Sequence, residues 1–165
     1  MATVTLKGNP VNTSGNIPAK GAAVKDFNLV RSDLSEVSLK DYAGKKKVLN
    51  IFPSVDTGTC AASVRHFNKD AANLTNTVVL NISMDLPFAQ ARFCGAEGIK
   101  NCESLSAFRS HFGPEWGLDI TDSPLKGLLS RVVITLSEDN KVLHAEQVSE
   151  IANEPNYEAA LASLR

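Results

Sequence analysis

The sequence predicts an α/β fold in which a mixed sheet is flanked by helices. Short apolar, β-rich runs recur along the chain, and between them lie segments whose apolar residues repeat with helical spacing. The middle of the chain has the order strand, helix, strand, helix, which implies a parallel pair of strands joined by a crossover helix. With 165 residues, the chain is expected to form a single domain over residues 1–165.

The N-terminal residues predict a small β-hairpin at the edge of the fold. Residues 3–7 alternate in polarity, Gly8-Asn9-Pro10 favours a turn, and residues 11–13 provide a second strand. Residues 27–30 and 37–39 indicate two short extended pieces that follow the hairpin.

Residues 48–52 form a compact apolar run between lysines and Pro53, which is typical of a buried central strand. The lysine run 45–47 is interpreted as the solvated entrance to that strand. The next segment changes to helical spacing, and its apolar face consists of Cys60, Val64, Phe67, Ala71 and Leu74. Cys60 is therefore expected on the inward face of this helix, in its first turn.

The rest of the chain continues the same alternation. Pro87 is well placed to open a helix through Phe93 or Cys94 that Gly95 or Gly98 would end. The other expected elements are a strand at 77–82, a helix at 104–112, a strand at 131–136, a strand at 141–148 and a helix at 155–164.

Charge and cysteine content exclude several classes of function. Seventeen basic and eighteen acidic residues give a net charge of -1, so neither nucleic acid nor an anionic membrane is an expected partner. The sequence has no apolar stretch long enough for a membrane span and no leader pattern, so a cytoplasmic location is expected. Three cysteines, an odd number, argue against a secreted disulfide framework.

The segment from Pro53 to Cys60 carries the most chemical information. It joins a buried strand to the start of a helix, where unpaired backbone N–H groups and the helix dipole both stabilise an anion. This placement favours the thiolate of Cys60, which is the nucleophilic form. Thr57 lies three residues earlier, where its hydroxyl can turn back toward the sulfur, and Pro53 shields one side of the loop. The pattern predicts a small pocket for two adjacent oxygens.

The spacing Pro53-x-x-x-Thr57-x-x-Cys60 resembles the motif of the peroxiredoxins, and the chain is similar to their bacterial thiol peroxidase subfamily. The resemblance extends through residues 50–68, 85–98 and 151–157 and covers nearly the whole chain, from residue 3 to residue 164. It implies a thioredoxin-like fold. Three features depart from the pattern: Cys102 is an extra cysteine, Thr59 replaces a small apolar residue, and residues 111–123 match only loosely.

The resemblance also implies a mechanism and site residues. Cys60 would be the peroxidatic cysteine, Thr57 would orient the peroxide, and Arg131 would place a guanidinium beside the sulfur. Cys94 matches the resolving cysteine of these atypical two-cysteine enzymes. Hydrogen peroxide and organic hydroperoxides would be reduced to water or alcohols through a sulfenic acid and an intramolecular Cys60–Cys94 disulfide. The resemblance further implies that thioredoxin recycles the enzyme and that its role is antioxidant defence. It also implies a homodimer. The chemistry would need no metal or cofactor.

Several of these residues also have other interpretations. Cys94 and Cys102 could instead be core residues. Arg131 could instead be an ordinary salt-bridged residue of a strand. The three histidines fit no metal-ligand spacing. A dithiol oxidoreductase is disfavoured because Cys60-Ala61-Ala62-Ser63 lacks a second cysteine. A redox sensor that signals through Cys60 remains an alternative on sequence alone.

Overall fold

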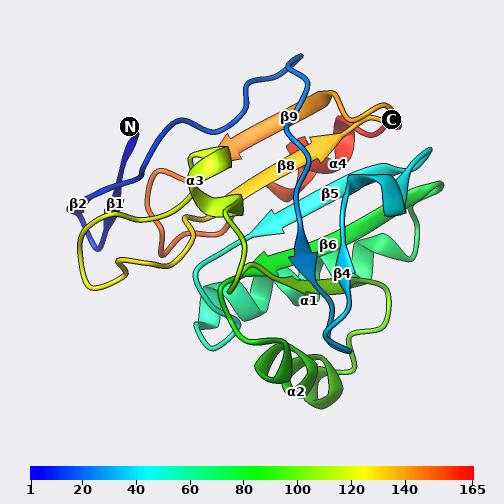
Figure 1. Cartoon of the computed structure of the whole chain (residues 1–165), viewed down its shortest axis with the longest axis horizontal. Coiled ribbons are helices and arrows are strands. Elements are labelled where there is room, and N and C mark those ends of the chain that lie inside the picture. The colour runs from blue at the N-terminus through cyan, green and yellow to red at the C-terminus, as the bar shows by residue number, and fades with distance from the viewer.

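The computed structural model describes residues 1–165 and confirms the mixed α/β fold (Figure 1). Its main sheet has seven strands in the order β4-β3-β7-β6-β5-β8-β9. The strands are β3 (Leu29–Val30), β4 (Glu36–Val37), β5 (Lys46–Ile51), β6 (Thr77–Ser83), β7 (Glu103–Ser106), β8 (Val132–Leu136) and β9 (Val142–Gln147). The expected parallel pair is confirmed, because β5 and β6 pair in parallel, and β8 pairs antiparallel to β5 on its other side.

Helices cover both faces of the sheet. They are α1 (Gly58–Ala71), α2 (Pro87–Glu97), α3 (Phe112–Trp116) and α4 (Tyr157–Ala162), with one turn of 3-10 helix, η1, at Leu39–Tyr42. In Figure 1, α1 and α4 lie behind the sheet, α3 lies in front, and α2 lies along the lower edge. The two chain ends lie on opposite sides of the molecule.

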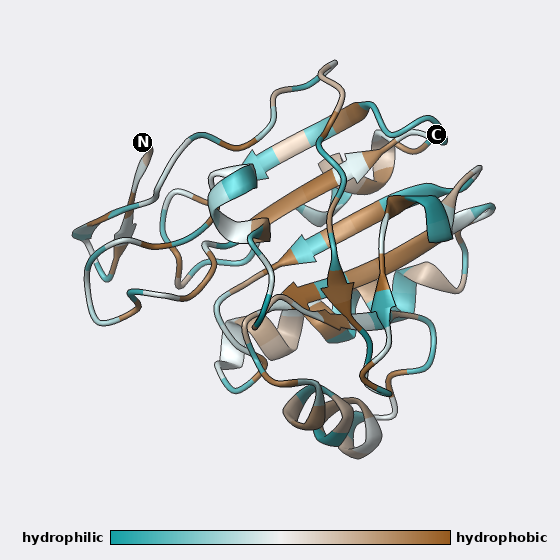
Figure 2. Ribbon diagram, in the orientation of Figure 1, coloured by the Kyte–Doolittle hydropathy of each residue, from teal (hydrophilic) through white to brown (hydrophobic).

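The alternation of side chains along the central strands divides the core in two. Leu49 and Ile51 of β5 point into a large cluster that includes Phe112 and Trp116 of α3, whereas Val48 points into a second cluster beneath α1 and α4. The central strands are accordingly the most hydrophobic ribbons in Figure 2. Burial on both faces explains why these runs are almost continuously apolar.

The predicted N-terminal hairpin is also confirmed. Its strands are β1 (Thr3–Leu6) and β2 (Asn9–Asn12), which pair antiparallel in a separate two-stranded sheet. Val4 and Val11 pack against Ile120 and Ile151, so the hairpin covers the loops rather than the main core.

The predicted helix over 104–112 is wrong. Residues 103–106 form β7, which pairs in parallel with β6, and a helix begins only at Phe112. Leu105 is completely buried in the sheet core. The conformation of residues 103–106 is therefore set by pairing with β6, and not by the local preference of these residues for a helix.

Two smaller expectations also need correction. Lys47 is not solvated: its side chain is fully buried, and its ammonium group donates a hydrogen bond of 2.6 Å to Asn140 Oδ1. Burial lowers the pKa of Lys47. The strand expected to begin at Arg131 begins one residue later, at Val132.

None of the helices is long and apolar enough to cross a membrane.

Candidate active site

Cys60 lies in the first turn of α1, as predicted, and its side chain is completely buried. It packs in a small cluster with Phe52, Val55 and Val64, against which Phe93 of α2 also packs. The first turn of α1 contains no acidic residue. Nothing in that turn therefore offsets the positive end of the helix dipole near the sulfur.

Thr57 is the N-cap of α1. Its Oγ1 accepts a hydrogen bond of 3.4 Å from the backbone N–H of Cys60, and its hydroxyl donates to the carbonyl oxygen of Ser54 at 3.3 Å. The N-cap hydrogen bond fixes the start of the helix and, with it, the position of Cys60. In this structure the Thr57 hydroxyl is therefore bonded to the backbone and not to the sulfur. Pro53 is buried at the beginning of the same loop.

Arg131 reaches the sulfur from the other side of the site. Its Nη2 donates to Cys60 Sγ at 3.3 Å, and its Nε donates to the carbonyl oxygen of Ile151 at 2.7 Å. The side chain is only 2% exposed, and it forms no salt bridge. Its Nη1 is buried without a hydrogen-bond partner. A buried guanidinium without a carboxylate is costly, so Arg131 depends on its contacts with the sulfur and the Ile151 carbonyl, and its Nη1 is a donor to spare for a ligand.

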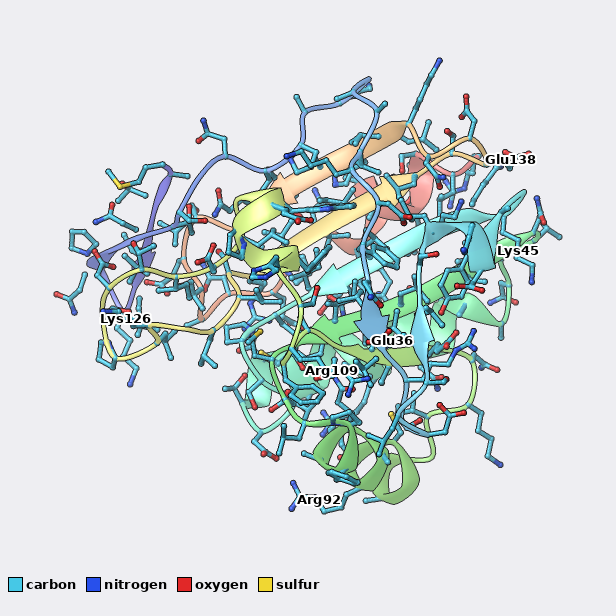
Figure 3. The ribbon with its side chains drawn as sticks, viewed as in Figure 1. Glu36, Lys45, Arg92, Arg109, Lys126 and Glu138 are labelled. Atoms are coloured by element: carbon cyan, nitrogen blue, oxygen red, sulfur yellow. The ribbon has the colours of Figure 1, made fainter.

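The loop before Cys60 is held by a residue that the sequence analysis did not single out. Asp85 follows β6, and its carboxylate accepts hydrogen bonds from Ser54 Oγ at 2.7 Å and from the backbone N–H of Val55 at 2.9 Å. An exposed ion pair of 3.4 Å between Asp56 and Arg92 makes a second connection to α2. Figure 3 shows Arg92 extending outward from that helix. Asp85 lies 30 residues from Val55, so no local pattern would have found this contact.

The structure does not bring Cys94 to Cys60. Cys94 is half-buried on α2, and its sulfur lies 3.2 Å from Ser104 Oγ of β7. Cys94 and Cys102 both line a pocket of about 230 Å³ between α2 and β7, and Cys60 does not. All three cysteines are free. A bond between Cys60 and Cys94 therefore requires local rearrangement.

Cys102 differs from Cys94 in its surroundings. It packs at the margin of the core cluster beneath α1, and burial raises the pKa of its thiol to about 12, with a small further increase from Cys94. The Asn81 side chain acts in the opposite direction. At neutral pH Cys102 is therefore a protonated, weakly nucleophilic thiol.

The histidines lie outside this site. His66 lies on α1, where its ring stacks on Tyr157 with centroids 3.7 Å apart and its Nε2 lies 3.0 Å from Asp70. No group of three or more His, Cys, Asp or Glu side chains is arranged to hold a metal ion.

The chain is similar in sequence to known proteins over nearly its whole length. The family model described as Redoxin matches residues 19–161. The thiol peroxidase of Corynebacterium glutamicum is 57% identical over 164 residues, which cover 99% of this chain and 99% of that protein.

Solved structures show the same architecture. A peroxiredoxin-like protein from Aquifex aeolicus superposes with a TM-score of 0.94 at 35% identity, over 99% of this chain and 96% of that one. A thiol peroxidase from Chromobacterium violaceum superposes with a TM-score of 0.90 over 97% and 93% of the two chains. At 23% identity, this second likeness concerns the fold alone.

Proposed function

Because the chain belongs to the redoxin family and to the thiol peroxidases within it, we propose that Cys60 is the cysteine that attacks the peroxide. The enzyme reduces hydroperoxides with a thiol and uses a thioredoxin-type reductant. The observation that carries the assignment of Cys60 is the 3.3 Å contact between its sulfur and Arg131 Nη2 in a buried site. Neither of the other cysteines has a cation within hydrogen-bond reach.

In the proposed reaction, the Cys60 thiolate attacks the terminal oxygen of the hydroperoxide. A sulfur–oxygen bond forms, the oxygen–oxygen bond breaks, and Cys60 becomes a sulfenic acid. The leaving oxygen departs as an alkoxide or hydroxide and takes a proton from water. Hydrogen peroxide therefore gives water, and organic hydroperoxides give alcohols.

Arg131 and Thr57 would stabilise this transition state. The unpartnered Nη1 of Arg131 supports a role in binding the peroxide oxygens, because a buried donor aimed at developing charge lowers the barrier without reorganisation. Thr57 is exposed, and its hydroxyl would give up its hydrogen bond to the Ser54 carbonyl oxygen and donate to the bound peroxide instead. Pro53 would shield the loop from water on its buried side.

Cys94 is proposed as the resolving cysteine. Its sulfur would attack the Cys60 sulfenic acid, form the disulfide and release water. The alternative, Cys102, is disfavoured because a thiol with a pKa of about 12 supplies almost no thiolate at neutral pH. Cys60 is buried, and Cys94 lines a pocket that does not include Cys60. The first turn of α1 and the end of α2 must therefore open before the two sulfurs can form a bond.

A homodimer is part of the proposal, and two exposed apolar side chains support it. Leu86 is 50% exposed and Phe88 is 67% exposed at the start of α2, close to the Asp56–Arg92 ion pair at the rim of the site. Exposed apolar residues that gather in one place are typical of protein interfaces. Sedimentation at micromolar concentration tests this assembly, and a monomer of the 17.7 kDa chain would contradict it.

A single domain over residues 1–165 and a cytoplasmic location complete the proposal. One seven-stranded sheet that draws strands from residue 29 to residue 147 supports the single domain. Three unpaired cysteines are suited to a reducing compartment. Limited proteolysis and cell fractionation test the two statements separately.

The function as a whole is tested by peroxide consumption. The pure protein is given hydrogen peroxide or an organic hydroperoxide, with either a thioredoxin system or glutathione as the reductant. We expect sustained turnover with thioredoxin and little with glutathione. An absence of turnover with both reductants would favour a redox sensor over a scavenging enzyme.

A further inference from the structure

We propose that Asp85 is a positioning residue for the peroxide attack, which holds the loop before Cys60 in its reactive shape and ties that loop to the helix carrying Cys94. This inference rests on the roles proposed above for Cys60 and Cys94. Asp85 contacts neither sulfur, so its effect is exerted through the backbone.

The Asp85 carboxylate bridges two side chains and one backbone group. Its Oδ1 accepts the 2.7 Å hydrogen bond from Ser54 Oγ, and its Oδ2 accepts hydrogen bonds from Val55 N–H at 2.9 Å and from Ser83 Oγ at 2.7 Å. Hydrogen bonds to a charged acceptor are stronger than those between neutral groups. The loop is therefore held by more than its own short-range contacts.

These contacts continue to Cys60 through the backbone. The Ser54 carbonyl accepts hydrogen bonds from both the N–H and the hydroxyl of Thr57, and Thr57 Oγ1 in turn accepts from Cys60 N–H. A continuous series of hydrogen bonds thus leads from Asp85 through Ser54 and Thr57 to Cys60. Displacement of Ser54 would move the N-cap and the first turn of α1 together.

Asp85 is itself held rigidly by the sheet. Its carbonyl oxygen accepts a hydrogen bond of 2.5 Å from Ser106 Oγ, and its carboxylate accepts the one from Ser83. Ser83 and Ser106 are paired in the register of β6 and β7, and both are completely buried. The anchor is therefore fixed by two core strands, which makes it a suitable reference point for the loop.

The position of Asp85 also couples the two halves of the catalytic cycle. Leu86 is the N-cap of α2 and Pro87 is its first residue, so Asp85 directly precedes the helix that carries Cys94. The hydrogen bonds to Ser54 and Val55 stabilise the closed loop, which attacks peroxide. Formation of the disulfide requires the loop to open, and these bonds oppose that opening.

The inference predicts that two measurable quantities both fall, because peroxide attack becomes slower while opening of the loop for disulfide formation becomes easier. In Asp85→Ala, the rate constant for Cys60 oxidation by hydrogen peroxide should fall at least about tenfold, since a displacement of 1 Å in a reacting group costs as much as about 100-fold. The fraction of Cys60 converted to sulfinic acid per turnover should also fall, because the loop opens more readily and Cys94 reaches the sulfenic acid sooner. Ser54→Ala should show both effects more weakly.

Asp122→Ala is the matched control. Asp122 also accepts a backbone and a side-chain hydrogen bond, from Asn12 at 2.8 and 2.7 Å, but it lies at the N-terminal hairpin. The oxidation rate is measured by rapid mixing, and the sulfinic acid fraction by mass spectrometry with the thioredoxin system present. Asp122→Ala should leave both quantities at their parental values.

Several outcomes would overturn the inference. It fails if Asp85→Ala is folded by near-UV circular dichroism and oxidises at the parental rate, or if Asp122→Ala changes both steps equally. If Asp85→Ala does not fold, Ser54→Ala decides the matter, because it removes only the contacts of the Ser54 hydroxyl, to Asp85 and to the backbone N–H of Asp56, and leaves the other hydrogen bonds of Asp85 in place. Peptide mapping of the parent protein after peroxide treatment tests the proposed function separately. If a residue other than Cys60 is oxidised, the proposed function is refuted, whereas oxidation of Cys60 leaves only the role of Asp85 in question.

Discussion

Replacement of Arg131 tests the electrostatic basis of the site most directly. Arg131→Met keeps most of the side-chain volume but removes the donor at 3.3 Å from Cys60 Sγ, the donor to Ile151 and the unpartnered Nη1. Arg131→Lys keeps the positive charge and loses the planar pair of donors. The two variants together separate the contribution of charge from that of geometry.

The size of the effect follows from the contacts that are lost. A hydrogen bond to a charged group contributes about 1.5–3 kcal/mol in a buried site, and each 1.36 kcal/mol of lost transition-state stabilisation slows a reaction about tenfold. Arg131→Met should therefore slow peroxide attack by about 10- to 150-fold at pH 7. Arg131→Lys should be intermediate, because an ammonium group supplies charge but reaches only one of the two reacting atoms.

The assay is rapid mixing with excess hydrogen peroxide, with Cys60 sulfenic acid trapped and quantified by mass spectrometry. Thermal unfolding of each variant establishes that the protein is folded at the assay temperature, since loss of the bond to Ile151 also affects stability. Folded Arg131→Met that is oxidised within about twofold of the parental rate would refute the role proposed for Arg131.

Three further predictions concern the cysteines. Cys60→Ser should abolish peroxide reduction and Cys102→Ser should retain nearly parental turnover in the thioredoxin-coupled assay; activity without Cys60 would contradict the central assignment. One equivalent of peroxide should give a Cys60–Cys94 link within one chain on non-reducing peptide mapping, and Cys94→Ser should accumulate Cys60 sulfinic acid; a dominant Cys60–Cys102 link would transfer the resolving role. The raised pKa of Cys102, about 12 against an ordinary value of 9.0, means that the unfolded chain loses this proton first, so stability should decline as pH rises from about 9 to about 12. Chemical denaturation at pH 8 and pH 10 should show a decline that is smaller in Cys102→Ala by about 1 kcal/mol, and equal declines would contradict the effect of burial.

Much of the fold could be predicted from the sequence because its signals are local. The buried strands β5 and β8 appear as short apolar runs, and the apolar spacing from Cys60 to Phe67 places the cysteine on the inward face of α1. The same holds for the loop from Pro53 to Cys60, where N-capping and a helix start depend on eight consecutive residues. The start of α2 at Pro87 follows in the same way.

Contacts between distant residues required the tertiary structure. Arg131 lies 71 residues from Cys60, and no spacing rule places its Nη2 beside the sulfur; only the pairing of β8 with β5 does so. Residues 103–106 became a strand because β6 offered an unpaired edge, which overrides a helical pattern in so short a segment. The same pairing carries Ser104 to Cys94 and Ser106 to Asp85.

The sequence alone therefore determined which residues have reactive chemistry, since nucleophile, N-cap and helix start lie within one turn of each other. The family resemblance implied Arg131 as the partner of Cys60, and the tertiary structure gave the contact itself. Only the tertiary structure showed Ser104 beside Cys94 and Asp85 against the loop. The physical reason is that helix starts and apolar periodicity depend on neighbours along the chain. Strand order and side-chain contacts instead depend on which buried surfaces and backbone groups satisfy one another across the whole fold.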